Sequence, residues 1–111
     1  MISTHVLDTT VGLPAAGVRV ALERRVGDAW TALGSATTDA DGRIRELLSP
    51  GAALERGVYR LHFETGAYFG ARGVKAFHPA VAVEFEVTDP SQRHHVPLLV
   101  TPFSHSTYRG S

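Results

Sequence analysis

Apolar and polar residues alternate along three separate segments of this chain. They are "VRVALER" (residues 18–24), "YRLHFET" (59–65) and "VAVEFEV" (81–87). Successive side chains of a β-strand point to opposite faces of a sheet, so each segment has one apolar and one polar face. Strands of this kind lie with one face against a core. The sequence therefore predicts an all-β protein.

Turn-forming sequences separate these segments. "GLPAAG" (12–17), "DADG" (39–42) and "TDPSQ" (88–92) combine glycine, proline and aspartate in the way that tight turns require. The spacing of runs and turns predicts seven or eight strands, which is typical of a β-sandwich or a barrel.

One segment does not follow the strand pattern. "TGAYFGARG" (65–73) offers Thr65 as a helix N-cap and Gly73 as a stop, which predicts about two helical turns. No repeat, low-complexity run or linker interrupts the chain, and its 111 residues are the length of one domain. We therefore expect a single domain over residues 1–111.

Composition excludes several classes of function. The net charge is zero, which gives no electrostatic basis for binding nucleic acid or an anionic membrane. There is no cysteine, so disulfides and thiolate chemistry are excluded. The first ten residues, "MISTHVLDTT", have neither the basic nor the apolar region of a signal peptide, and no apolar run is long enough to span a bilayer. The cytoplasm is the expected location.

The segment "HHVPLLVT" (94–101) is apolar on both faces. Val96, Leu98 and Val100 form one apolar face, while Pro97 and Leu99 form the other. A strand that is apolar on both sides is normally covered on both sides. Because a sandwich of this size has only two layers, we expect a partner subunit to supply the second cover.

Three polar residues occupy the outward positions of predicted strands. They are His5, Arg43 and His95, and each directly precedes an apolar residue that is expected to point into the core. Taken singly, each is an ordinary solvent-facing residue. His95, however, shares its face with Leu99, and this is the face that we expect to be covered by a partner.

Other sequence motifs that could carry chemistry are incomplete. "TTDADGRIRELL" imitates a calcium-binding loop, but Leu48 stands where a bidentate glutamate is required. His94 and His95 are neighbours in a strand and face opposite ways, so they do not form a zinc site together. The serines lack a G-x-S-x-G nucleophile elbow. Asp39 and Asp41 belong to a turn and do not form a glycosidase pair.

Several segments, taken in order, resemble a known enzyme family. They are "STHVLDTTVGLPAAGVRV", "TDADGRI", "FETGAYF", "VPLLVTP" and the final "YRGS". Together they are similar to the 5-hydroxyisourate hydrolases, the transthyretin-related enzymes of urate degradation, over essentially the whole chain. The final "YRGS" distinguishes these hydrolases from transthyretin, because transthyretin lacks it. The chain reads Arg93-His94-His95 where the family often has His-Tyr-His, but the histidine before Val96 is retained.

The resemblance implies a fold, an assembly and a site. The fold would be a transthyretin-like eight-stranded β-sandwich with one short helix, assembled as a homotetramer with its sites at the dimer–dimer interface. The catalytic residues would be His5, Arg43 and His95, and the substrate would be bound by Tyr108, Arg109, Gly110 and Ser111. No metal or organic cofactor is implied.

The implied reaction opens a ring of 5-hydroxyisourate by hydrolysis of an amide. Water attack needs a base and a donor for the developing oxyanion. We assign His95 as the base, with His5 positioning water or relaying a proton, although the two roles are interchangeable on the sequence alone. Arg43 supplies a planar donor fork. Two alternatives are a transthyretin-like carrier that binds a small ligand without turnover, and a structural or adhesion β-sandwich.

Overall fold

Two β-sheets and one short helix make up the chain, and the computed structural model describes all of residues 1–111. In chain order the elements are β1 (Ile2–Asp8), β2 (Leu13–Pro14), β3 (Arg19–Val26), β4 (Ala29–Thr37), β5 (Arg43–Ile44), β6 (Gly57–Phe63), α1 (Thr65–Gly70), β7 (Val81–Val87), β8 (His94–Val100) and β9 (His105–Thr107). The six-residue α1 is the only helix, and it falls far short of the length that a membrane-spanning helix needs.

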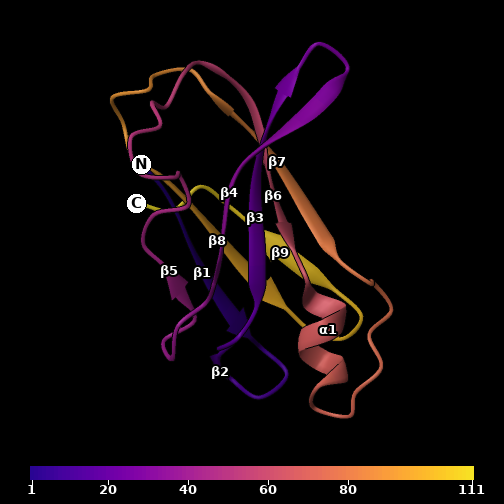
Figure 1. The fold of residues 1–111 in the computed structure, drawn as a ribbon. Coiled ribbons are helices and arrows are strands. Elements are labelled where there is room, and N and C mark those ends of the chain that lie inside the picture. Colours follow the sequence, from indigo (N-terminus) through magenta and orange to yellow (C-terminus); the bar gives the residue numbers. More distant parts are fainter.

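The sheets differ in how their strands are connected. One has the order β4-β3-β6-β7, and all of its neighbouring strands are antiparallel. The other has the order β2-β1-β8-β9, with β5 also paired to β1. At its centre β1 and β8 run parallel, which brings the first strand of the chain beside a late one. The two chain ends consequently lie close together (Figure 1).

The core lies between the two sheets and contains twenty buried apolar residues. The alternating strands supply most of it, as the sequence predicts: Val20 and Leu22 from β3 and Leu61 and Phe63 from β6 are fully buried. Burying a large aliphatic or aromatic side chain stabilises the folded state by roughly 1.5–3 kcal/mol. This core therefore fixes which face of each strand points outward.

Two details differ from the sequence-based expectation. The structure has nine strands where eight were expected, and two of the nine, β2 and β5, contain only two residues each. Thr65 is not the N-cap of the helix, because Glu64 occupies that position and makes no side-chain capping bond. Thr65 is instead the first helical residue, and its buried hydroxyl has no hydrogen-bond partner.

The outer face of β8 is partly covered by the chain itself. Pro97 is buried, and the Cγ of its ring lies 3.1 Å from the position that a Cβ would occupy at Gly110. The expectation that a partner must cover this face is therefore wrong for Pro97. Leu99, on the same face, is only half-buried.

Candidate functional site

Strand pairing brings the three outward polar residues together. His5 lies opposite Arg43 in the short β1–β5 ladder, and Ser3, two residues before His5, lies opposite His95 in the parallel β1–β8 ladder. All four side chains therefore belong to neighbouring positions on the outer face of one sheet. The sequence predicted three of them, and the pairing unites them in one region.

A tight turn fixes the position of Arg43. The carboxylate of Asp39 accepts hydrogen bonds from the backbone N–H groups of Asp41 and Arg43, at 2.9 and 3.0 Å. Gly42 has a φ of +75°, and a Cβ there would overlap the carbonyl oxygen of Val6. Only glycine fits such a position. The "DADG" sequence is therefore a turn that holds β5 against β1, as predicted, and not a calcium loop.

A cavity of about 440 Å³ opens on this face. The lining side chains that carry chemistry are Ser3, Arg43, Arg45, Arg93, His95 and Ser111. Three of these are arginines, and no carboxylate side chain lines the cavity. Positively charged side chains around a concave site attract anionic ligands. The cavity is therefore suited to a small anionic or carbonyl-rich molecule.

His95 presents one free ring nitrogen. Its Nδ1 lies 2.8 Å from the Oγ of Ser3, while its Nε2 has no hydrogen-bond partner within the chain. Partial burial lowers the pKa of His95, and the positive charges of Arg43 and Arg93 lower it further. A neutral imidazole is able to accept a proton. His95 is therefore neutral at pH 7 and suited to act as a base.

His5 is held in a defined orientation. Its Nε2 lies 2.9 Å from the backbone carbonyl oxygen of Asp41. A carbonyl oxygen only accepts hydrogen bonds, so the neutral ring carries its proton on Nε2. The other nitrogen, Nδ1, then remains an acceptor. The same turn that positions Arg43 thus also orients His5.

The tail residues divide between two cavities, and His95 lines both of them. The backbone N–H of Gly110 donates to the carbonyl oxygen of His95 at 2.8 Å, and Ser111 lines the 440 Å³ cavity. Tyr108 and Arg109 line a second cavity of about 250 Å³ near the edges of the two sheets. Within one chain, therefore, Ser111 joins Arg43 and His95 around one cavity, whereas Arg109 does not.

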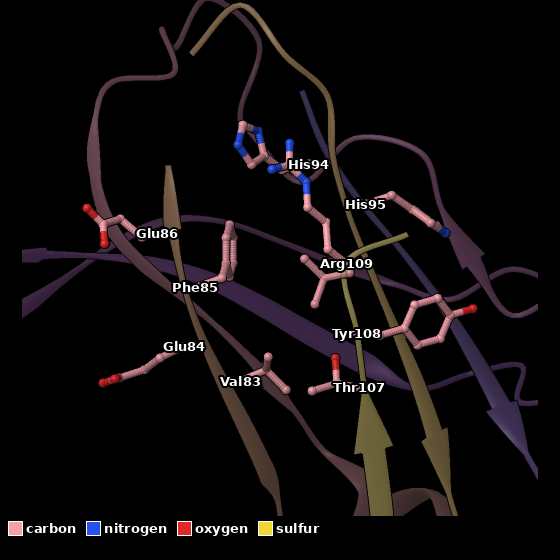
Figure 2. Close-up of a pocket in the computed structure, with 10 residues that line it drawn as sticks. Val83, Glu84, Phe85, Glu86, His94, His95, Thr107, Tyr108 and Arg109 are labelled. Carbon is pink, nitrogen blue, oxygen red and sulfur yellow. The ribbon is translucent and has the colours of Figure 1, made fainter. Parts of the chain in front are cut away.

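The side chains around the second cavity are drawn in Figure 2. Arg109 extends toward His94, and its guanidinium donates to the side-chain oxygen of Gln92 at 3.1 Å. The rings of Tyr108 and His95 point away from Phe85. Tyr108 is thus directed toward the same side as His95, although it does not line the first cavity.

His94 and His95 face opposite ways, as predicted. His94 is buried and packs toward Phe85, with 6.4 Å between ring centroids. Burial lowers the pKa of His94, and the charge of Arg109 lowers it further. Nowhere in the chain do three or more histidine, cysteine, aspartate or glutamate side chains gather in a group that could hold a metal ion.

Sequence reasoning missed Ser3, Arg45 and Arg93. Ser3 lies two residues before His5 on the same outward face of β1, so the period-two pattern contained a signal for it. Its contact with His95 depends on the parallel pairing of β1 with β8, between residues 92 positions apart. Nothing in the local sequence of either strand specifies that pairing.

Comparison with known proteins places the chain in a family. The model of the HIUase/Transthyretin family matches residues 2–110. The chain belongs to this family. Its two-layer sandwich with one short helix is the transthyretin-like fold, which confirms the fold class predicted from the sequence.

Relatives within the HIUase/Transthyretin family include enzymes. A protein of Salmonella dublin named 5-hydroxyisourate hydrolase is 43% identical over 111 residues, which are 100% of this chain and 81% of the relative. The solved structure of Klebsiella pneumoniae 5-hydroxyisourate hydrolase has a TM-score of 0.86 at 39% identity, covering 99% of this chain and 98% of the other.

The family also contains transthyretin. Sea bream transthyretin in complex with thyroxine has a TM-score of 0.90 at 31% identity, covering 98% of this chain and 93% of the other. The backbone is therefore similar to that of a hydrolase and to that of a protein crystallised with thyroxine. The side chains around the cavity must distinguish the two activities.

Proposed function

We propose that this protein is a 5-hydroxyisourate hydrolase, with residues 1–111 forming one hydrolase domain. The observation that carries the proposal is the 440 Å³ cavity, where the free Nε2 of His95 lies among arginines on the outer face of the sheet. Relatives with 39–43% identity over nearly the whole chain are named for this activity. The product is 2-oxo-4-hydroxy-4-carboxy-5-ureidoimidazoline, formed in urate degradation.

The reaction begins with attack by water on a ring amide of the substrate. His95 Nε2 takes a proton from water as the oxygen bonds to the carbonyl carbon. The carbon–nitrogen bond of the amide then breaks, the carbon becomes a carboxylate carbon, and the departing nitrogen takes a proton. The lowered pKa of His95 supports its role as base, because the ring is neutral before water attacks.

Arg43 binds the substrate and stabilises developing negative charge. Its guanidinium offers a planar fork of donors that matches a carbonyl or carboxylate oxygen. The cavity contains further arginines and no carboxylate side chain, so negative charge that appears on the substrate meets favourable surroundings. Hydrolysis by these steps uses water and protein side chains.

His5 assists the base. Its Nε2–H is held by the carbonyl of Asp41, so Nδ1 is left to accept a hydrogen bond from water or to relay a proton. Ser111, at the cavity, binds substrate or water through its hydroxyl. Tyr108, Arg109 and Gly110 belong to the same proposed substrate-binding segment, with Gly110 in direct backbone contact with His95.

We propose a homotetramer with the sites at the dimer–dimer interface. The lone chain leaves large apolar side chains exposed, among them Phe77 and Phe103, which are 73% and 72% exposed. Exposed apolar clusters are typical of interaction surfaces. Strands β7 and β9 also lie at open sheet edges, whose unpaired backbone groups are able to pair with another copy.

A transthyretin-like carrier is the second candidate, because the chain is similar to sea bream transthyretin. Two measurements separate the hydrolase from such a carrier, namely identification of the reaction product and binding of thyroxine. Nuclear magnetic resonance of the reaction mixture should identify the ring-opened product before it forms spontaneously. A carrier would bind thyroxine and leave 5-hydroxyisourate to decay at its uncatalysed rate. The cytoplasmic location is part of the same proposal, and fractionation of the source cells tests it.

A further inference from the structure

The imidazole of His95 is held from one side by a buried serine. The Oγ of Ser3 lies 2.8 Å from His95 Nδ1, and this is the only hydrogen bond that the Ser3 side chain makes. Ser3 is 5% exposed. It also lies directly opposite His95 in the parallel β1–β8 ladder, so the backbone of two central strands sets the distance between them.

Gly110 holds the ring from another side. Its N–H is bonded to the carbonyl oxygen of His95, and a Cβ at Gly110 would overlap the Cδ2 atom of the imidazole. The backbone therefore passes so close to the ring that only a residue without a side chain fits. Gly110 does not have a positive φ, so backbone conformation alone does not require glycine there.

We propose that Ser3 and Gly110 are positioning residues that fix the orientation and the tautomer of His95 for the proposed hydrolysis. In the neutral ring, Nδ1–H donates to the Oγ of Ser3, and the hydroxyl proton of Ser3 is directed into the cavity that Ser3 lines. Nε2 then carries the lone pair and faces water. This inference rests on the proposed function and adds two residues that act through His95.

The tautomer matters because only one ring nitrogen of a neutral histidine is able to accept a proton. If Nε2 carried the hydrogen, the base would be Nδ1, which is already in contact with the hydroxyl of Ser3. A partner at one ring nitrogen holds the ring in place and, where it accepts a hydrogen bond, favours the proton on that nitrogen. A serine hydroxyl is able to donate or to accept, and we assign Ser3 the acceptor role because its own O–H is able to bond water in the cavity that Ser3 lines. Ser3 supplies that partner.

Ser3→Ala tests the hydrogen bond through kinetics. We expect kcat to fall by about tenfold or more, while KM changes by less than about twofold. The matched control is Tyr59→Phe in β6 of the other sheet, which deletes another buried hydroxyl, bonded at 2.7 Å to the backbone carbonyl of Glu55. The control should lower Tm and keep wild-type kcat. Equal losses of kcat in the two variants, or wild-type kcat in Ser3→Ala, would overturn the proposal.

A spectroscopic experiment tests the tautomer of His95 without the substrate. Two-bond ¹H–¹⁵N correlation spectra of ¹⁵N-histidine-labelled protein report which ring nitrogen is protonated, and His95→Asn identifies the signals of His95. We expect the Nδ1–H form in the wild type and a mixture of both forms in Ser3→Ala. An Nε2–H form in the wild type would overturn the inference even if the enzyme were active. If the protein failed to hydrolyse 5-hydroxyisourate, this experiment would still test Ser3.

Gly110→Ala tests the packing contact. The added methyl group must displace the imidazole, so we expect about a tenfold or greater loss of kcat and a shifted His95 signal. The control is Gly70→Ala, because a Cβ at Gly70 would meet nothing within 4 Å and the helix end tolerates alanine. Wild-type kcat in Gly110→Ala, or an equal loss in Gly70→Ala, would contradict the role of Gly110.

Discussion

At the scale of single residues, His95 is distinguished from the other histidines by its surroundings. It lines a cavity with Arg43 and has a free Nε2, whereas His62 is on the other sheet, 3.1 Å from a carboxylate oxygen of Glu64. His78 packs edge-on against Phe77. The cavity and the free Nε2 therefore distinguish His95, as the proposed base, from His62 and His78.

Replacing His95 by Asn should lower kcat/KM by about 10²–10⁴-fold, because an amide is unable to serve as a base. The thermal midpoint should stay close to that of the wild type, since His95 is only partly buried. His62→Asn and His78→Asn are the controls and should keep nearly full activity. A loss in His62→Asn as large as that in His95→Asn would show that the wrong face of the molecule had been assigned.

Arg43→Ala should change both the rate and its pH dependence. The acid limb of kcat/KM reports the pKa of the base in the free enzyme. In the wild type this limb should lie below the ordinary histidine value of about 6.5, because burial and nearby positive charges lower the pKa of His95. Removing the charge of Arg43 raises that pKa, so the limb should move to higher pH as kcat/KM falls. A limb that stays in place would contradict the electrostatic account.

Stability should decrease as the pH falls below about 6.5. Burial lowers the pKa of both His94 and His95 in the folded state. Between these lowered pKa values and the ordinary histidine pKa of about 6.5, the unfolded chain therefore binds more protons than the folded chain. Protonation therefore favours unfolding in that window. The thermal midpoint should be higher near pH 7.5 than near pH 5.5, and His94→Gln should reduce the difference. An equal difference in His94→Gln would exclude His94 as a source.

At the scale of elements, the tail acts together with β8. Gly110 is bonded to His95, and Ser111 lines the cavity. Deleting residues 108–111 should lower kcat/KM by at least about tenfold, equivalent to about 1.4 kcal/mol of transition-state stabilisation. Ser111→Ala should reproduce part of that loss.

The tail deletion needs a structural control. Activity and thermal midpoint should be measured on the same preparation, because a tail that only closes the sheet would lower the midpoint without a specific kinetic effect. Full activity in the deleted protein would remove the tail from the site and leave His5, Arg43 and His95 as its proposed residues.

Local pattern predicted the strands and their faces but not how the strands pair. Alternation identified the inward faces of β3, β6 and β7 because burial follows a period of two residues. The pairing of β1 with β8 is set by the tertiary structure, and this pairing places Ser3 in contact with His95. The burial of Pro97 was missed for the same reason, since it depends on where the tail returns.

Helix capping shows a second limit of local pattern. Thr65 was expected to cap the helix by its hydroxyl, but Glu64 occupies the N-cap position without a capping bond. Gly66 donates to the carbonyl of Pro79, so tertiary contact of the first turn fixes where the helix begins. Propensity is a weak guide for a helix of only six residues.

At the scale of the whole molecule, we expect self-association. Light scattering at micromolar concentration should return the mass of a tetramer, four times 11.9 kDa. The apolar side chains Phe77 and Phe103 are exposed in the lone chain, and the net charge is zero, so electrostatic repulsion between copies is weak. Phe103→Glu should weaken the assembly. A monomer in the wild type would exclude a site between dimers.

The central claim is that His95, within this cavity, makes the chain a 5-hydroxyisourate hydrolase. It is tested most directly by the initial rate at which freshly generated 5-hydroxyisourate disappears, followed by absorbance with wild-type protein, with His95→Asn and with buffer alone. The account predicts a wild-type rate far above spontaneous decay and a rate for His95→Asn that is close to it. A wild-type rate no faster than buffer, or a His95→Asn rate equal to that of the wild type, would contradict it.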